Sequence, residues 1–218
     1  MELIAAGRDA DVFALDDRRV LRRYRDGRPA HQDAGLLGAV VDAGYPAPAV
    51  LGVDGPGMVL ERLSGPTLAD ELLAGRCDAG EAGAILASLH ARLHALPWPD
   101  GPLLHLDLHP SNVVLAGRGP VVIDWTDART GPAGLDVATT ALILAQTVLS
   151  PADATVQGAA DVVAGVASAV LRAFVAATGP GYRDHLDEAV ARRRAVPMMT
   201  DDELERMDDA RALAARAS

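Results

Sequence analysis

One stretch near the middle of the chain restricts the possible fold more than any other. Residues 105–112 read HLDLHPSN, which has the form H-x-D-x-x-x-x-N, and two apolar runs follow, separated by the segment GRGP at 117–120. Apolar β-branched runs on either side of a Gly-containing turn predict a β-hairpin. Because a hairpin reverses the chain, we expect Asp124, which follows the second run, to return close to Asn112, which precedes the first.

Three side chains around this hairpin carry oxygen atoms suited to one kind of chemistry. Asp107, Asn112 and Asp124 are expected to converge at one end of it. Magnesium prefers oxygen ligands, usually one or two carboxylates together with substrate phosphates and water. Phosphoryl transfer also needs a carboxylate that accepts the proton of the attacking hydroxyl. The spacing therefore favours a magnesium-dependent site for phosphoryl transfer.

The same segment carries a resemblance to a known family. Together with VVIDW at 121–125, GP at 131–132 and DVA at 136–138, it resembles the aminoglycoside phosphotransferase and choline-kinase-like enzymes, small-molecule relatives of protein kinases. The resemblance implies an α+β, bilobal protein-kinase-like fold. A small antiparallel sheet with one helix would form the N-lobe, and a larger, mainly helical part would form the C-lobe.

The resemblance also implies roles for individual residues. Asp107 would be the catalytic base, Asn112 and Asp124 would hold Mg²⁺, and ATP would be the phosphate donor. Three further residues of this segment would brace or orient the catalytic loop: His105, His109 and Asp136.

The first third of the chain fits the N-lobe of such a fold. Apolar runs predict strands at 3–6, 12–15, 19–24, 49–53 and 57–61, and a helical pattern of apolar residues predicts a helix at 30–43. The loop after the first strand contains Gly7, where kinase-like enzymes cover the phosphates. A single glycine is also compatible with an ordinary hairpin loop.

Arg22 lies in the third strand, at the place where kinase-like enzymes have a phosphate-binding lysine. All 20 basic residues of the chain are arginine. Arginine can hold a phosphate in bidentate fashion, but its shape differs from that of lysine. Asp33 corresponds to the glutamate that pairs with that lysine, so we hypothesise an Arg22–Asp33 ion pair. A solvated surface arginine remains the alternative for Arg22.

The segment MVLERL at 58–63 resembles the hinge between kinase lobes. Backbone groups near Glu61 and Leu63 would receive the edge of the adenine. We therefore expect a nucleotide-binding lobe at residues 1–63 and a catalytic and substrate-binding lobe at residues 64–218.

Start signals predict several helices in the second part. Thr67 with Asp70, Asp78, the segment SPAD at 150–153, and Thr200 with Glu203 are typical helix beginnings. His90 and His94 have a spacing that can bind metal, but a structural role is favoured because no H-E-x-x-H pattern accompanies them. The triple 192–194 (RRR) is interpreted as a solvated face, with a phosphate or partner role as the alternative.

Composition excludes some classes of partner. A formal charge of −10 and an aromatic content of 3% make nucleic acid a poor partner, since its affinity comes largely from cationic side chains. The negative field favours a cationic small molecule, or it serves solubility. Cys77, the single cysteine, rules out an internal disulfide, and no leader or membrane-spanning run is apparent. A cytoplasmic location is expected.

The leading interpretation is an ATP- and Mg²⁺-dependent kinase that phosphorylates a hydroxyl of a small molecule. A nucleotide-binding protein without transferase activity is a second possibility, because the lysine is absent and the loop has few glycines. A metal hydrolase using His105, Asp107 and His109 is a third, although it leaves Asn112 and Asp124 unexplained.

Overall fold

The computed structural model describes residues 1–7, 9–150, 157–196 and 199–218. The chain divides into two compact units: Met1–Gly65 with Val114–Thr126 forms the first, and Pro66–Val113 with Asp127–Ser218 forms the second. The first segment of the first unit ends at Gly65, two residues after the division expected at residue 63. The larger difference is that Val114–Thr126 groups with the first unit rather than the second.

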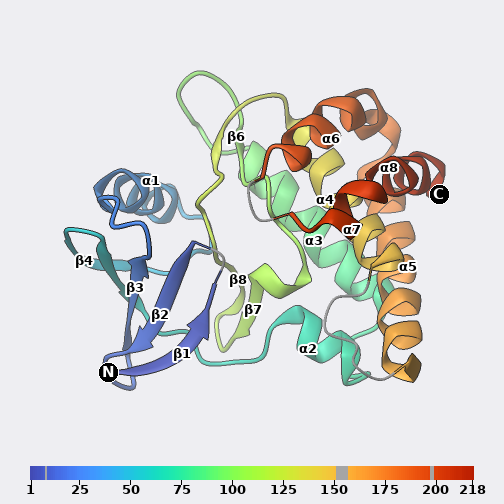
Figure 1. The fold of residues 1–218 in the computed structure, drawn as a ribbon. Helices are drawn as coiled ribbons and strands as arrows, with labels where there is room; N and C mark the ends of the chain where they lie inside the picture. Colours follow the sequence, from blue (N-terminus) through green and yellow to red (C-terminus); the bar gives the residue numbers. More distant parts are fainter. Residues whose placement is uncertain (8, 151–156, 197–198) are drawn as a thin grey trace. The chain divides into compact units, whose positions relative to one another are not determined.

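The first unit is built on a five-stranded antiparallel sheet with strand order β1-β2-β3-β5-β4 (Figure 1). Side chains alternate between its two faces, so Val20, Met58 and Leu60 are buried on one face. Its sheet strands and its helix are β1 (Glu2–Ala6), β2 (Ala10–Ala14), β3 (Arg19–Tyr24), α1 (His31–Asp42), β4 (Val50–Asp54) and β5 (Gly57–Glu61).

The predicted hairpin is confirmed, and its contacts explain why it belongs to the first unit. Strands β7 (Val113–Ala116) and β8 (Gly119–Val122) pair with each other. The amide of Val122 donates to the carbonyl of Pro46 at 2.8 Å. The guanidinium of Arg118 bonds the carboxylate of Glu61, with Nη2 at 2.9 Å from Oε2. The placement of Asp124 beside Asn112 stays a prediction.

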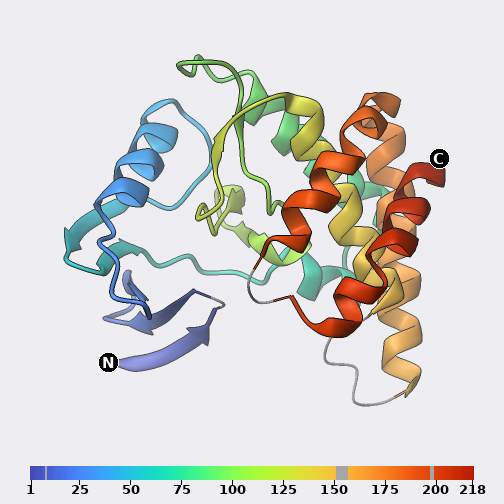
Figure 2. The same cartoon turned by 45° about the horizontal axis from the view of Figure 1, so that its top comes forward.

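The second unit is helical around the buried helix α4. Helix α4 packs against α5, α6 and α8, and α3 runs beside α5 (Figures 1 and 2). Leu142 on α4 and Phe174 on α5 are fully buried. The unit also contains the 3₁₀ helices η1 (Pro110–Asn112) and η2 (Pro180–His185) and a short strand pair, β6 (Leu103–Leu104) with β9 (Arg129–Thr130). Its α-helices are α2 (Leu68–Leu73), α3 (Ala79–His94), α4 (Ala133–Leu149), α5 (Gln157–Thr178), α6 (Leu186–Arg194), α7 (Asp201–Glu205) and α8 (Met207–Arg216).

Most of the predicted helix starts are present. Thr67 and Thr200 each form a capping box, and the carboxylate of Asp78 accepts the amide of Glu81 at 2.8 Å. The start expected at 150–153 lies largely outside the described residues. The 3₁₀ turn η2 leads directly into α6, and the helix expected from Thr200 is divided at Arg206 into α7 and α8.

By length and composition, one helical segment among the described residues, Ala159–Thr178, could cross a membrane. Core helices of soluble proteins meet the same criteria, and this segment belongs to α5, which packs against α3 and α4.

The close contact of α3 with α5 gives a first prediction. A Cβ atom at Gly83 would lie 2.6 Å from the Cβ of Ala173 and 2.7 Å from the amide nitrogen of Phe174. Gly83→Ala should therefore lower the free energy of unfolding by about 1–3 kcal/mol through overpacking, even after the gain in helix propensity of about 1 kcal/mol. Urea unfolding followed by circular dichroism measures the change.

Gly165→Ala on α5 is the matched control, because a Cβ atom at that position would have nothing within 4 Å. It should stabilise the chain by up to about 1 kcal/mol. Equal stabilisation by both substitutions would contradict the close packing of the two helices.

Candidate functional site

Asp107 lies in a loop of the second unit, where polar side chains surround its carboxylate. Its Oδ2 accepts a hydrogen bond from Nδ2 of Asn112 at 3.0 Å and lies 3.7 Å from Nε2 of His109. Its Oδ1 lies 3.6 Å from Nη1 of Arg193. Burial alone would raise the pKa of Asp107, but the neighbouring His109 and the charge of Arg193 lower it. The carboxylate is therefore ionised and held in place.

Asp136, on the first turn of α4, braces this loop through its carboxylate. Its Oδ1 accepts the amide of Leu106 at 2.7 Å, and its Oδ2 accepts the amide of His105 at 3.1 Å and Nε2 of His94 at 2.9 Å. Leu106 has a φ of 63°, a left-handed conformation that a branched side chain rarely adopts. The two bonds from consecutive amides hold the backbone in this conformation.

Burial alone would raise the pKa of Asp136, which is fully buried, but the hydrogen bond with His94 and the nearby histidines lower it to about 2. The bracing contacts of Asp136 are therefore those of a buried, ionised carboxylate.

The two helical histidines have structural partners. Nδ1 of His90 lies 2.8 Å from the carbonyl of Leu86, and its Nε2 lies 3.1 Å from the hydroxyl of Thr140. That hydroxyl donates to the carbonyl of Leu108 at 2.7 Å, so α4 holds the loop around Asp107 at a second point.

The metal-hydrolase alternative finds no support in this geometry. The described part of the chain contains no group of three His, Cys, Asp or Glu side chains placed to hold a metal ion. His105 is fully buried, and its Nδ1 accepts the amide of Asp107 at 3.2 Å. The histidine thus orients the loop backbone rather than offering that nitrogen to a metal.

Arg22 forms the centre of a second group of residues, in the first unit. Its Nη2 donates to Oδ1 of Asp124 at 2.9 Å and to the hydroxyl of Thr126 at 2.7 Å, and its Nη1 donates to the hydroxyl of Tyr24 at 2.6 Å. The side chain is only 14% exposed. It is therefore a mostly covered, paired arginine and not a solvated one.

The hypothesised direct pair of Arg22 with Asp33 is replaced by a relay. Tyr24 lies two residues after Arg22 on the same face of β3, and its hydroxyl donates to Oδ2 of Asp33. Arg22 and Asp33 form no ion pair within the described chain, whereas Nη2 of Arg28 lies 3.8 Å from Asp33. Burial and the hydrogen bond to Asp33 raise the pKa of Tyr24 to about 12, so its hydroxyl keeps its proton.

Asn112 and Asp124 each offer an oxygen that fits a magnesium ion. Asn112 uses its amide nitrogen to bond Asp107, and Asp124 uses Oδ1 to accept from Arg22 and Thr126. Within the described residues, no hydrogen bond occupies Oδ1 of Asn112 or Oδ2 of Asp124. Each side chain thus keeps one oxygen of the type that Mg²⁺ prefers.

The residues expected to contact the nucleotide differ in how they are used. A Cβ atom at Gly7 would lie 2.9 Å from the carbonyl oxygen of Ala10, so the turn between β1 and β2 requires a glycine. The carboxylate of Glu61 bonds Arg118 and the amide of Ala49, and its own amide bonds the carbonyl of Ala49. The amide of Leu63 has no hydrogen-bond partner among the described residues.

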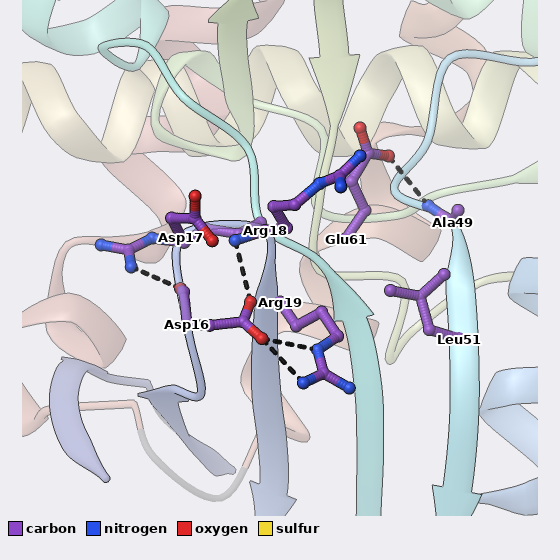
Figure 3. A pocket seen from close by; sticks show the side chains of 8 residues that line it. Asp16, Asp17, Arg18, Arg19, Ala49, Leu51 and Glu61 are labelled. Atoms are coloured by element: carbon purple, nitrogen blue, oxygen red, sulfur yellow. Dashed lines mark hydrogen bonds and ion pairs between the residues drawn. The ribbon is translucent and has the colours of Figure 1, made fainter.

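A hollow of about 690 Å³ opens on the sheet beside Glu61 (Figure 3). Arg19 is paired with Glu61 across β3 and β5, so both side chains lie on the face opposite to Arg22. Asp16 closes one side of the hollow by accepting from Arg19 and from the amide of Arg18 (Figure 3). This hollow is therefore distinct from the group around Arg22.

Some residues of the groups around Asp107 and Arg22 could not be predicted from a sequence motif. Tyr24 and Thr126 belong to no motif, and only the strand alternation that places Tyr24 on the face of Arg22 could have indicated it. The interpretation of Arg193 as part of a solvated triple is wrong, because this residue is 8% exposed.

A comparison with models of known families decides the classification. The phosphotransferase enzyme family matches residues 1–105 and 98–184. The chain belongs to this family. No curated protein sequence gives a significant match to this phosphotransferase-family chain.

Solved structures confirm the α+β, protein-kinase-like fold of this family member. The ADP-bound aminoglycoside phosphotransferase APH(2'')-Ib is similar over 98% of this chain and 93% of its own, with 12% identity and a TM-score of 0.61. A choline/ethanolamine kinase family protein from Mesorhizobium loti is similar over 99% and 91%, with 14% identity and a TM-score of 0.59. An ethanolamine kinase from Plasmodium vivax is similar over 98% and 81%, with 10% identity and a TM-score of 0.57.

The buried carboxylate of Asp136 gives a prediction with a pH dependence. Asp136→Asn removes a charge that three donors surround, so the free energy of unfolding at pH 7 should fall by about 2–4 kcal/mol. A lowered pKa stabilises the folded state above the ordinary value of 3.8, and this contribution is lost as the pH falls toward about 2. Urea unfolding at several pH values should therefore show the wild type and the variant converging below pH 3.8.

Asp161→Asn, at an exposed position of α5, is the matched control and should leave stability within about 0.5 kcal/mol of wild type. A constant difference between Asp136→Asn and wild type across the acid range would contradict the role of the ionised carboxylate.

The relay through Tyr24 gives a separate prediction. Tyr24→Phe removes a hydroxyl that bonds both Arg22 and Asp33, so unfolding free energy should fall by about 1–3 kcal/mol. Chemical denaturation measures the loss, and the double variant Tyr24→Phe with Asp33→Asn should cost less than the sum of the two single changes. If the two changes in unfolding free energy simply add, the hydroxyl of Tyr24 does not interact with the carboxylate of Asp33.

Proposed function

We propose that this chain transfers the γ-phosphate of ATP to a hydroxyl of a small molecule in a magnesium-dependent reaction. The observation that carries the proposal is the carboxylate of Asp107, ionised and fixed by Asn112 on a loop that Asp136 braces. Phosphoryl transfer depends mainly on positioning and charge, and a carboxylate that orients the attacking hydroxyl is its central protein group. Membership of the phosphotransferase family supports the same reaction class.

In this proposal Asp107 orients the acceptor hydroxyl and accepts its proton as the new P–O bond forms and the bond between the γ-phosphorus and ADP breaks, so that ADP leaves. Asn112 and Asp124 would hold Mg²⁺ through their available oxygens, and the ion would neutralise charge on the phosphates. Arg22 would steady the phosphates. A guanidinium has five N–H groups, and Tyr24, Asp124 and Thr126 use three of Arg22's, so two remain.

The adenine edge would be received by backbone groups at Glu61 and Leu63, and the Gly7 turn would lie over the phosphates. The unpartnered amide of Leu63 supports the first assignment. Two similar structures are described as ADP-bound and as a ternary complex with streptomycin and ATP, which supports a nucleotide donor. The net charge of −10 favours a cationic acceptor.

A nucleotide-binding protein without transferase activity is the second candidate. One observation favours it: the guanidinium of Arg22 bonds Asp124, the carboxylate assigned to the metal ion. Retention of Asp107 in a braced and ionised state favours the enzyme.

The test combines nucleotide binding with turnover. Purified chain is titrated with ATP and Mg²⁺ by calorimetry, and nucleoside-diphosphate release is followed over a panel of amino sugars, amino alcohols, neutral sugars and hydroxy acids. Asp107→Asn should lower turnover by about 10²- to 10⁴-fold and leave nucleotide affinity within about threefold, whereas Asp124→Ala should weaken binding of Mg-ATP. Asp184→Asn, at an exposed position, should change neither quantity.

Binding of Mg-ATP with no turnover on any acceptor would favour the second candidate. Absence of both binding and turnover would exclude the two together.

A further inference from the structure

The arginine triple at 192–194 separates into two kinds of side chain in the structure. Arg192 pairs with Glu188 at 3.3 Å and Arg194 pairs with Asp208 at 2.8 Å, and both side chains are at least one-third exposed. The side chain of Arg193 is 10% exposed and points inward from α6. A single arginine of the three is therefore buried.

Arg193 is held between α4 and the catalytic loop. Its Nε donates to Oε1 of Gln146 at 3.1 Å, and its Nη1 lies 3.6 Å from Oδ1 of Asp107. Gln146 is itself buried on α4, and its Nε2 has no hydrogen-bond partner among the described residues. A buried donor left unpaired destabilises the fold, so a glutamine at this position is unfavourable unless its acceptor oxygen matters. That oxygen fixes the guanidinium.

The two oxygens of Asp107 face different partners. Oδ2 accepts from Asn112 at 3.0 Å, whereas Oδ1 faces Arg193 at a distance too long for a hydrogen bond. Arg193 therefore attracts this oxygen through its charge and leaves the oxygen's lone pairs available. An acceptor hydroxyl needs such an oxygen, fixed in direction and still able to accept.

We propose that Arg193 is a positioning residue for Asp107: the buried guanidinium, held by Gln146, fixes the rotation of the catalytic carboxylate. The proposal rests on the proposed function. Helix α4 would then control the site twice, by holding the loop backbone through Asp136 and the carboxylate through Gln146 and Arg193.

The test compares Arg193→Met, Arg193→Lys and the matched exposed variant Arg192→Met in the full chain. A misplaced reacting group costs up to about 100-fold in rate, so we expect kcat of Arg193→Met to fall by about 10- to 100-fold. KM for ATP should stay within about twofold of wild type, because Asp107 binds no nucleotide. Arg193→Lys should recover part of kcat, and Arg192→Met should match wild type.

Chemical rescue separates positioning from a purely structural role. Guanidinium chloride at low millimolar concentration, compared with equal sodium chloride, should raise kcat of Arg193→Ala severalfold and leave wild type unchanged. A folded Arg193→Met with wild-type kcat would overturn the proposal, as would an equal loss in kcat and in the folded fraction with no rescue.

A double-mutant cycle tests the pairing of Arg193 with Asp107 separately from the proposed phosphate transfer. The shift in urea midpoint caused by Arg193→Met should be smaller when Asp107 is replaced by Asn, since the charge that Arg193 faces is then gone. If the wild type transfers phosphate to no acceptor, the proposed function fails. The cycle still decides the pairing: equal shifts in both backgrounds would show that Arg193 does not act on Asp107.

Discussion

The buried carboxylate of Asp136 makes the interactions on which the loop around Asp107 in the second unit depends. Backbone amides of a loop cannot remain unpaired inside a protein without a cost of about 1–3 kcal/mol each. Asp136 accepts two consecutive amides, at Leu106 and His105, and its remaining capacity is taken by His94. A neutral side chain of the same size could not accept all three bonds, so the ionised acid determines the course of the loop.

The shape of this loop in turn fixes where Asp107 can lie. Leu106 adopts a left-handed conformation, which costs about 1–3 kcal/mol for a residue other than glycine and persists only where the surroundings enforce it. The amide bonds from Asp136 supply that enforcement, and the buried Leu106 side chain is 7% exposed. Asp107 follows directly after this left-handed residue, and its carboxylate faces Asn112 and Arg193. The conformation of the loop, the position of helix α4 and the position of the Asp107 carboxylate therefore depend on one another.

The sequence predicts the features that depend on local order and misses those that depend on packing. The hairpin after Asn112 and the capping boxes at Thr67 and Thr200 follow from residues a few positions apart, so their signals are contained in short segments. The family motif likewise predicts that Asp136 braces the loop, and its bonds to the amides of His105 and Leu106 are present, whereas the catalytic role of Asp107 stays a prediction. The role of Tyr24 could not be predicted, because its hydroxyl bonds one side chain from strand β3 and one from helix α1, which only the folded structure brings together. Arg193 escapes it because three consecutive arginines carry no indication of which one turns inward.

Under the proposed function, charge would act on an acceptor at two ranges. The net charge of −10 attracts cations from solution, but salt screens such fields beyond about 8–10 Å. Close to Asp107 the nearest fixed charge is instead the guanidinium of Arg193, 3.6 Å from Oδ1. Arg193 is positive and Asp107 is negative, so beside this pair their electric fields oppose each other and largely cancel. Under the proposed function, the long-range field would bring a cationic acceptor in, and the fixed direction of Oδ1 rather than the local charge would decide which hydroxyl meets Asp107.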